Sequence, residues 1–462
     1  MTHLGYAALL TIATLAADAE SVPINQRQAR TSPEWITGGV MYQIQPRAFT
    51  PEGTLPAATA RLPKVAELGV DIIYICPVFV ADDDPEGWSP RQKKSGMNNP
   101  RNPYRMKDYY HVDPEYGTDA DLKAFVAEAH RLGMRVMLDM VYLHCGPNAV
   151  FLEEHPNFVE RDEKGDIVCA SWNFPKINHA NPELREYLWQ NMEYWVRDFD
   201  VDGFRCDVAN SVPLDFWETA RERLEKIRPD VGMLAEGTRP ADQLKAFDLD
   251  YGWGFNWDNA TKFRVQWEKM RDDRPRGGAK FIRFIDNHDI SNDDYDNRLE
   301  KQWGSRRVHA ALVTMFTLDG VPLVYNGQEV ADTARHSIFG KSPIDWPNGD
   351  TPAGKARFAF CQKLCGMRNA ERALTHGEVV WLDNDAPEAI LSFLRRTDDE
   401  EVLAVVNLTG QEVRVRVTLP QEGTPGFKPL LADGIKKETT EGGKQEFLVD
   451  GNAYFVGKRV RQ

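Results

Sequence analysis

Short apolar runs alternate along the chain with longer stretches in which apolar residues recur every three or four positions. The runs are rich in β-branched residues, and several are almost continuously apolar, which is typical of strands buried on both faces of a parallel sheet. The weakest of them is the sixth. The eight runs cover residues 39–44, 71–78, 135–141, 203–208, 233–236, 246–251, 281–286 and 321–325.

Helical patterns separate these runs. The stretch at 119–132 places Leu122, Phe125, Val126 and Ala129 on one face, and Gly133 follows as a stop signal. Similar patterns cover residues 182–199, 213–227 and 305–317. Eight strands that alternate with helices predict an α/β fold, a (β/α)8 TIM barrel over residues 36–374.

One helix pattern carries a proline. Pro63 interrupts the first helical stretch after the first strand. Proline removes a backbone donor and crowds the preceding turn, so we expect this helix to begin late or to bend.

Two segments depart from the alternation. Residues 145–180 contain turn signals and little helical period, which predicts a short insertion after the third strand. Beyond residue 375 short alternating runs appear, and we interpret residues 375–462 as a C-terminal antiparallel β-sandwich domain. Its predicted strands cover residues 389–394, 401–408, 412–419 and 445–449.

The N-terminal segment, residues 1–35, precedes the barrel. An apolar run at 6–15 is followed by the small residues Ala17 and Ala19, a pattern that resembles a signal peptide. Only His3 stands where such peptides usually carry Lys or Arg. We therefore predict a secreted or periplasmic protein, with a cytoplasmic protein carrying a frayed tail as the alternative. No other stretch approaches the roughly 20 apolar residues of a membrane span.

Composition narrows the class of partner. The net charge of −14 argues against a nucleic-acid backbone, which selects basic surfaces. Twelve tryptophans suit either a large core or the flat faces of neutral sugars. Six cysteines show no C-x-x-C pair, so we expect buried thiols and no zinc module.

Polar side chains gather where the predicted strands end. In a (β/α)8 barrel the carboxyl ends of the strands carry the active site, so these side chains should meet at one rim. A polar group in a buried strand is costly unless it is paired or functional. The set comprises Asp139, His144, Arg205, Asp207, Glu236, Asp286, His288 and Asp289.

Three of these carboxylates suggest acid–base chemistry on a glycoside. Cleavage needs one protonated carboxyl group for the leaving oxygen and one ionised carboxylate as nucleophile or base. We expect Arg205 to hold Asp207 ionised, Glu236 to keep the proton, and Asp289 to stabilise positive charge on the sugar. Each residue alone is more often a cap or surface charge, and the set could instead hold a divalent metal ion.

Four of these stretches resemble the signature regions of the α-amylase family, glycoside hydrolase family 13. They are DMVYLH at 139–144, GFRCD at 203–207, AE at 235–236 and FIDNHD at 284–289, in the family's order. YQIQPRAF at 42–49 and GVPLVYNGQE at 320–329 are similar to its first and eighth strands. FPKIN at 174–178 resembles a stretch of the neopullulanase and cyclomaltodextrinase group.

The resemblance implies a role for each matching residue. Asp207 would be the nucleophile, Glu236 the acid and base, and Asp289 the carboxylate that binds ring hydroxyls. Substrate would also be bound by four other residues. Arg205 would orient the nucleophile, His144 and His288 would hydrogen-bond the sugar, and Tyr104 would stack on it.

One departure bears on cofactors. Leu143 stands where many members of the family have an asparagine that binds a structural calcium ion. Leucine offers no oxygen ligand, so we expect no calcium at that position, and no other metal or cofactor.

The function that we predict is hydrolysis of α-1,4 or α-1,6 glucosidic bonds in malto-oligosaccharides or starch-like glucans with retention of configuration. An alternative is a transglycosylase or isomerase that uses the same glycosyl-enzyme. A third is a carbohydrate-binding homologue without catalysis, although such proteins usually lack one of the carboxylates. The oligomeric state is left open.

Overall fold

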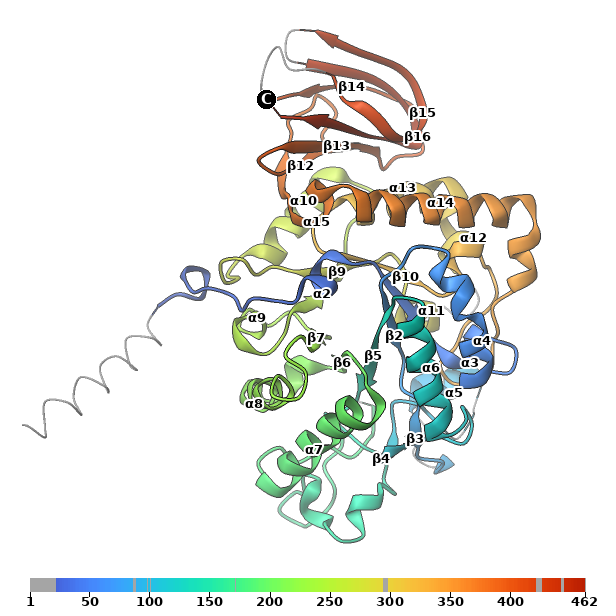
Figure 1. Cartoon of the computed structure of the whole chain (residues 1–462), viewed down its shortest axis with the longest axis vertical. Coiled ribbons are helices and arrows are strands. Elements are labelled where there is room, and N and C mark those ends of the chain that lie inside the picture. Colours follow the sequence, from blue (N-terminus) through green and yellow to red (C-terminus); the bar gives the residue numbers. More distant parts are fainter. Residues whose placement is uncertain are drawn as a thin grey trace, which may run out of the picture.

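Figure 1 shows the computed structural model of the chain, a helix-covered barrel with an antiparallel sheet beside it. The structure describes residues 22–85, 89–97, 99, 101–170, 172–293, 298–420, 426–441 and 444–461. The predicted signal peptide lies outside these residues, so export remains a prediction. In the described part, no helix combines the length and the apolar character needed to cross a membrane.

Eight parallel strands close into the barrel in their order along the chain. They confirm the predicted fold class, and each predicted run overlaps one strand; the weak sixth run supplies only three residues. The strands are β1 (Met41–Ile44), β2 (Ile72–Ile75), β5 (Arg135–Met140), β6 (Gly203–Cys206), β7 (Gly232–Ala235), β8 (Leu249–Tyr251), β9 (Phe281–Arg283) and β10 (Val321–Tyr325).

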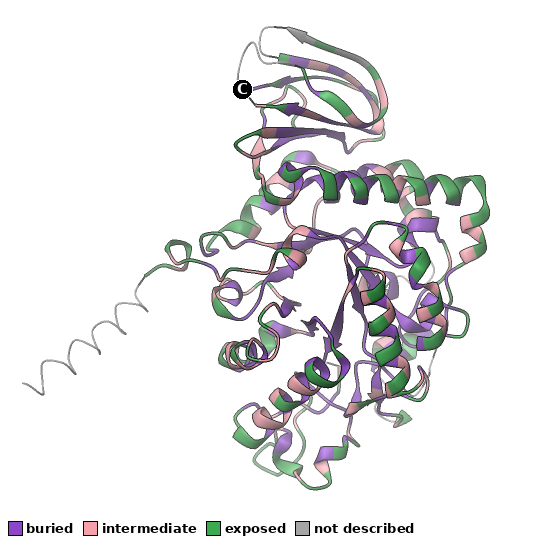
Figure 2. Cartoon of the chain, viewed as in Figure 1, coloured by how far each residue is buried: buried purple, intermediate pink, exposed green. Residues whose placement is uncertain are grey.

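Both faces of these strands are buried. In β2, Ile72 and Tyr74 belong to the cluster that fills the barrel, whereas Ile73 and Ile75 pack in the cluster between the strands and the helices. This alternation explains why the strand sequences are continuously apolar. Figure 2 shows the same division, with buried strands inside and helices that expose their outer faces.

The helices follow the predicted patterns closely. The barrel helices are α4 (Leu55–Ala66), α6 (Asp119–Arg131), α7 (Pro182–Phe199), α8 (Leu214–Leu224), α10 (Ala260–Arg271), α13 (Ser305–Thr317) and α14 (Pro352–Ala370). Shorter helices are α2 (Glu34–Gly38), α3 (Pro46–Phe49), α5 (Pro90–Ser95), α9 (Asp242–Lys245), α11 (His288–Asp293), α12 (Leu299–Trp303) and α15 (Arg372–His376). Thr118 forms a capping box at α6, and the Asn181 side chain caps α7.

The expected late start of the first long helix was wrong. Helix α4 begins at Leu55 and contains Pro63. An interior proline costs about 3 kcal/mol. Leu55, Leu62 and Val65 are buried on the inner face, and each contributes roughly 1.5–3 kcal/mol, so burial outweighs the proline.

Two excursions rise from the carboxyl ends of strands. The first, between β2 and α6, contains α5 and an antiparallel pair formed by β3 (Phe79–Ala81) and β4 (Met106–Val112), which the sequence analysis did not predict. The second is the predicted insertion after β5, where isolated bridges such as His144↔Lys176 and Val159↔Ile177 replace regular strands. Both excursions therefore border the mouth of the barrel (Figure 1).

The C-terminal region is antiparallel, as predicted, and its described strands all belong to one hydrogen-bonded sheet. The long strand β16 connects them, since its first part pairs with β14 and its last part with β13. Leu403, Val415, Phe447 and Phe455 fill the core that the sheet encloses. The strands are β11 (Glu378–Trp381), β12 (Ile390–Arg396), β13 (Glu400–Asn407), β14 (Val413–Thr418), β15 (Lys428–Glu441) and β16 (Lys444–Val460).

Candidate active site

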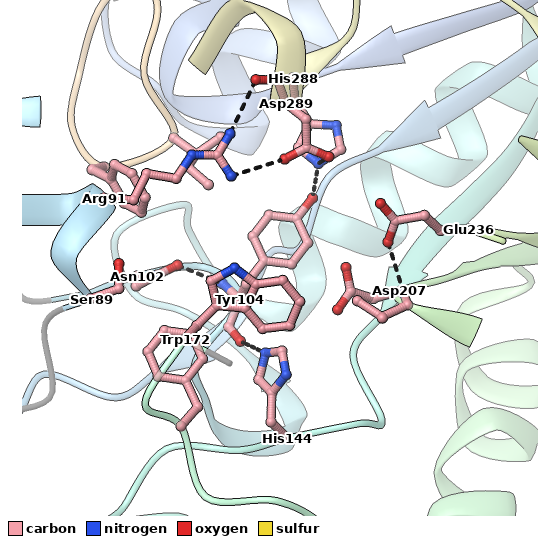
Figure 3. Close-up of a pocket in the computed structure, with 14 residues that line it drawn as sticks. Ser89, Arg91, Asn102, Tyr104, His144, Trp172, Asp207, Glu236, His288 and Asp289 are labelled. Carbon is pink, nitrogen blue, oxygen red and sulfur yellow. Dashed lines mark hydrogen bonds and ion pairs between the residues drawn. The ribbon is translucent and has the colours of Figure 1, made fainter. Parts of the chain in front are cut away.

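A pocket opens at the carboxyl ends of the barrel strands (Figure 3). Six of the seven predicted site residues line it, and the seventh, Arg205, lies fully buried behind it. The lining residues are Ser89, Arg91, Asn102, Tyr104, His144, Trp172, Phe174, Asp207, Val208, Glu236, His288, Asp289, Ile338 and Phe339.

Arg205 connects three carboxylates. Its Nη1 donates to Asp139 Oδ1 at 2.6 Å and to Asp207 Oδ1 at 2.9 Å. Its Nη2 lies 2.7 Å from Glu236 Oε2, an ion pair without the angular geometry of a hydrogen bond. One guanidinium therefore fixes the two predicted catalytic carboxylates relative to each other.

The ends of β6 and β7 set this arrangement. The parallel ladder continues one residue past each strand, as the Asp207 N–H donates to the Met140 carbonyl and the Glu236 N–H to the Cys206 carbonyl. Arg205 and Asp207 are two residues apart and so lie on the same side of β6.

Val208 has an unusual backbone conformation directly after Asp207. Its φ of 43° lies in the left-handed region, which a β-branched residue rarely adopts. In this conformation its N–H donates to Glu236 Oε2 at 2.8 Å. Strain of this kind costs of order 1–3 kcal/mol and recurs at functional sites. No sequence signal identifies Val208 as a site residue.

Charge is unevenly distributed in this cluster. Burial raises the pKa of Asp207 well above its usual range; Arg205 opposes that shift, and the neighbouring carboxylates add to it. Burial likewise raises the pKa of Asp139 to about 6, although the positive charge of Arg205 acts to lower it. The expected contact between Arg205 and Asp207 is present, but the effect of burial on the pKa of Asp207 outweighs that of Arg205. One cation facing three carboxylates favours retention of a proton within the cluster.

His288 belongs to a chain of hydrogen bonds. Gln43 Nε2 donates to His288 Nδ1 at 2.7 Å, so His288 Nε2 carries the proton and donates to the Tyr104 hydroxyl at 2.7 Å. That hydroxyl donates to Asp139 Oδ2 at 2.9 Å. Burial lowers the pKa of His288 to about 3, so the imidazole is neutral and its orientation is fixed.

His144 has a spare acceptor. Its Nε2 donates to the Tyr104 carbonyl at 2.9 Å, which leaves Nδ1 unprotonated and without a partner among the described residues. Burial lowers its pKa to about 4, so the ring is neutral near pH 7. This nitrogen is covered by neighbouring atoms, although the His144 ring itself lines the pocket.

Asp289 projects from the first turn of α11. The Asn287 side chain accepts hydrogen bonds from the N–H groups of Asp289 and Ile290, which fixes the start of the helix. Arg91 approaches from α5: its Nη2 donates to the Asp289 carbonyl at 3.2 Å, and its Nη1 lies 3.7 Å from Asp289 Oδ1.

Several lining residues escaped prediction. Arg91 lies in the short helix α5, Ile338 and Phe339 lie in the loop after β10, and no sequence signal assigns them to the pocket. Trp172 lies with its ring centroid 5.6 Å from that of His144. A tryptophan within a polar insertion was the one signal that could have identified it, because sugars pack on aromatic faces.

These residues are poorly suited to bind a divalent metal ion, which was the alternative to acid–base chemistry. In the described part of the chain, the group with metal-like spacing comprises Cys76, Asp139 and His288. Asp139 already accepts bonds from Arg205, Tyr74 and Tyr104. Both ring nitrogens of His288 are also engaged. A divalent ion would have to displace these partners beside a buried guanidinium.

Comparisons with known proteins agree with this geometry. The family model "Alpha amylase, catalytic domain" matches residues 25–166 and 158–372. A cyclomaltodextrinase of Bacillus sp. is 26% identical over 449 residues, which are 83% of this chain and 75% of that protein. Neopullulanase 2 of Thermoactinomyces vulgaris is 26% identical over 463 residues, covering 87% and 74%. The crystal structure of a maltogenic alpha-amylase, AmyB, from Thermotoga neapolitana has a TM-score of 0.80 at 27% identity and covers 92% of this chain and 100% of that one.

Proposed function

Since this chain belongs to the alpha-amylase family of glycoside hydrolases, which act on α-glucans, we propose that it hydrolyses α-1,4 or α-1,6 glucosidic bonds in malto-oligosaccharides and starch-like glucans with retention of configuration. The observation that carries the proposal is the contact of Asp207 and Glu236 with one guanidinium, that of Arg205. Shared contact favours the close carboxyl pair of retaining enzymes over the wider gap that inverting enzymes need for water.

In the first step, the proton that the cluster retains lies on Glu236, and the ionised Asp207 carboxylate attacks the anomeric carbon as the bond to the leaving oxygen breaks. Glu236 gives its proton to that oxygen. Glu236 Oε2 already receives the Val208 N–H and lies beside Arg205, so the proton belongs on Oε1. The product of this step is a glycosyl ester of Asp207.

In the second step, the ionised Glu236 takes a proton from water, and the resulting nucleophile attacks the same carbon. The ester bond breaks and releases Asp207 as a carboxylate. Two inversions at one carbon restore the α configuration.

The other predicted residues hold the sugar during both steps. Asp289 accepts from ring hydroxyls and favours the positive charge that develops on the ring. His144 lines the same pocket, and Tyr104 and the unpredicted Trp172 present aromatic surface to the ring.

We also propose that no calcium ion is bound at the position of Leu143. Its side chain is buried in the apolar core and supplies no oxygen. Treatment with EDTA should leave both activity and the unfolding temperature unchanged, and a loss of either that calcium restores would contradict this.

The test is an NMR time course on maltotriose and on soluble starch. We expect new reducing ends to appear first as the α anomer, before mutarotation. Initial release of the β anomer, or no release from either substrate, would contradict the proposal. Longer or rearranged oligosaccharides at high acceptor concentration would instead indicate transfer of the glycosyl group to sugars.

A further inference from the structure

One end of the pocket is walled by two loops that are distant in sequence. The excursion between β2 and α6 contributes Ser89, Arg91 and Asn102. The loop after β10 contributes Ile338 and Phe339. Figure 3 shows Arg91, Ser89 and Asn102 across the pocket from Glu236. We refer to these five residues as the end wall.

The two loops of the end wall are joined directly. The Asn99 N–H donates to the Phe339 carbonyl at 3.2 Å, and the Arg335 guanidinium donates to the Ser95 carbonyl. Gly340 packs so tightly on Met97 that an added Cβ would lie 2.9 Å from the Met97 Cβ. The loops are therefore in contact, with no room for a sugar chain between them at these points.

A buried arginine reinforces the junction from behind. Arg47, which is 1% exposed, donates through Nη1 to the Ile338 carbonyl at 2.6 Å and through Nη2 to the Arg101 carbonyl. Its Nε also pairs with Glu115 at 2.8 Å. Separation of the loops would leave a buried cation without part of its hydrogen bonding, which is costly.

The end wall stands immediately beside the catalytic residues. Arg91 contacts both the carbonyl and the carboxylate of Asp289. Under the proposed function, Asp289 holds the hydroxyls of the sugar attacked by Asp207, and Glu236 marks the side of the leaving group. The wall therefore closes the opposite side, where the rest of the chain beyond that sugar would otherwise extend.

We infer that the enzyme acts only at non-reducing chain ends and accepts a single glucosyl unit between Glu236 and the end wall. This inference rests on the proposed function. Cleavage within a chain requires the chain to continue beyond the sugar that Asp207 attacks. Here the joined loops occupy the path that this continuation would follow. Arg91 donates to the terminal hydroxyls of the glucosyl unit.

The test compares three substrates with the wild-type enzyme. They are a p-nitrophenyl maltoheptaoside with a free non-reducing end, the same compound blocked there by a 4,6-O-ethylidene group, and α-cyclodextrin, which has no end. Chromatography of the products, without any coupling enzyme, reports cleavage of the p-nitrophenyl compounds, and reducing-sugar release reports cleavage of the cyclodextrin. We expect cleavage of the free compound, with kcat/KM on the other two lower by at least about 100-fold because the end wall excludes them.

Other outcomes separate the two proposals. Equal cleavage of the free and blocked compounds, or efficient opening of the cyclodextrin, would overturn chain-end action while leaving the hydrolase intact. If none of the three is cleaved, the proposed function itself fails, and this inference fails with it.

Two variants locate the restriction. Arg91→Ala removes a side chain of the end wall, and Arg335→Ala removes one link between the loops. Each should raise the blocked-to-free ratio of kcat/KM by at least about 10-fold, because the excluded substrate gains space. A general loss of structure would lower both rates together and leave the ratio unchanged, as should the exposed control Arg131→Ala. An unchanged ratio in both test variants would overturn the assignment to the end wall.

Discussion

The charged cluster behind the mouth of the barrel and the core of the C-terminal sheet are both buried but differ in what they bury. At the mouth, Asp139, Arg205 and His288 are at most 1% exposed. In the sheet, Phe447 and Val415 are fully buried among other apolar side chains. One region thus buries groups that prefer water, and the other buries groups that avoid it.

This difference implies that the mouth of the barrel contributes mainly to catalysis and the sheet core mainly to stability. Buried apolar area stabilises the fold at roughly 25 cal/mol per Å². Buried ionisable groups at best recover their desolvation cost through partners such as Arg205. Substitutions at the mouth should therefore change catalysis more than stability, and substitutions in the sheet core should do the reverse.

The largest expected effect is that of Asp207→Asn. The variant keeps the shape of the side chain but removes the nucleophile, so kcat/KM on the free maltoheptaoside should fall by at least about 10⁴-fold. Burial disfavours the ionised form of Asp207, so the unfolding free energy should stay within about 1 kcal/mol of wild type or rise. The measurements are steady-state kinetics and chemical denaturation.

Asp433→Asn is the matched control in the C-terminal sheet, since Asp433 is half exposed and lies far from the pocket lining. It should leave both quantities unchanged. Near-normal activity of Asp207→Asn would contradict the assigned role.

The converse effect is expected for Phe447→Ala. Phe447 is fully buried, with its ring centroid 5.2 Å from that of Phe455. Its truncation should lower the unfolding free energy by about 3–5 kcal/mol, while kcat/KM of the folded enzyme stays at the wild-type value. Val460→Ala, at a position that is 68% exposed, serves as the control. A large loss of kcat/KM in Phe447→Ala would show that the two regions are coupled.

A smaller effect depends on pH. The pKa of His144 is about 4 in the folded protein, below the ordinary 6.5, so the neutral ring stabilises the fold above pH 6.5. That contribution is lost as the pH falls toward 4, because the unfolded chain binds the proton more readily. Between pH 6.5 and 4.5 this histidine alone accounts for about 2 kcal/mol of the stability that is lost.

His144→Gln should therefore lose about 2 kcal/mol less than wild type over that interval, as measured by urea denaturation at both pH values. Phe447→Ala removes no titrating group, so its deficit should be the same at both pH values. If His144→Gln shows the pH dependence of wild type, His144 is not the buried neutral group that the structure indicates.

The smallest effect concerns the strained residue Val208. Val208→Gly and Val208→Ala both remove the branched side chain, but only glycine adopts a φ of 43° freely. The glycine variant should be more stable than the alanine variant by about 1 kcal/mol. Thermal unfolding of the pair provides the comparison, and a more stable alanine variant would argue against strain at this position.

Much of the fold followed from local pattern. Runs of apolar residues predicted all eight barrel strands, because a strand that is buried on both faces is apolar at nearly every position. The antiparallel sheet was predicted only in part. β11, β15 and the last part of β16 were missed; β15 pairs with β16, which follows it directly in the sequence, and the last part of β16 pairs with β13.

The residues of the candidate site also fall into two groups, those that the strand pattern predicts and those that it does not. Asp207 and Glu236 directly follow short buried runs, so their positions could be predicted from the strand pattern alone. Arg91 and Phe339 follow no pattern. They reach the pocket because loops 240 residues apart are joined, as between Ser95 and Arg335.

The sequence by itself determined the barrel, the strand ends that carry the carboxylates and the family to which these motifs correspond, because each of these features is encoded within a few consecutive residues. The tertiary structure decided how the charges share Arg205, which strained backbone group contacts Glu236, and which loops close one end of the pocket. These features depend on contacts between segments that are distant in sequence, and such contacts produce no periodic pattern of apolar and polar residues.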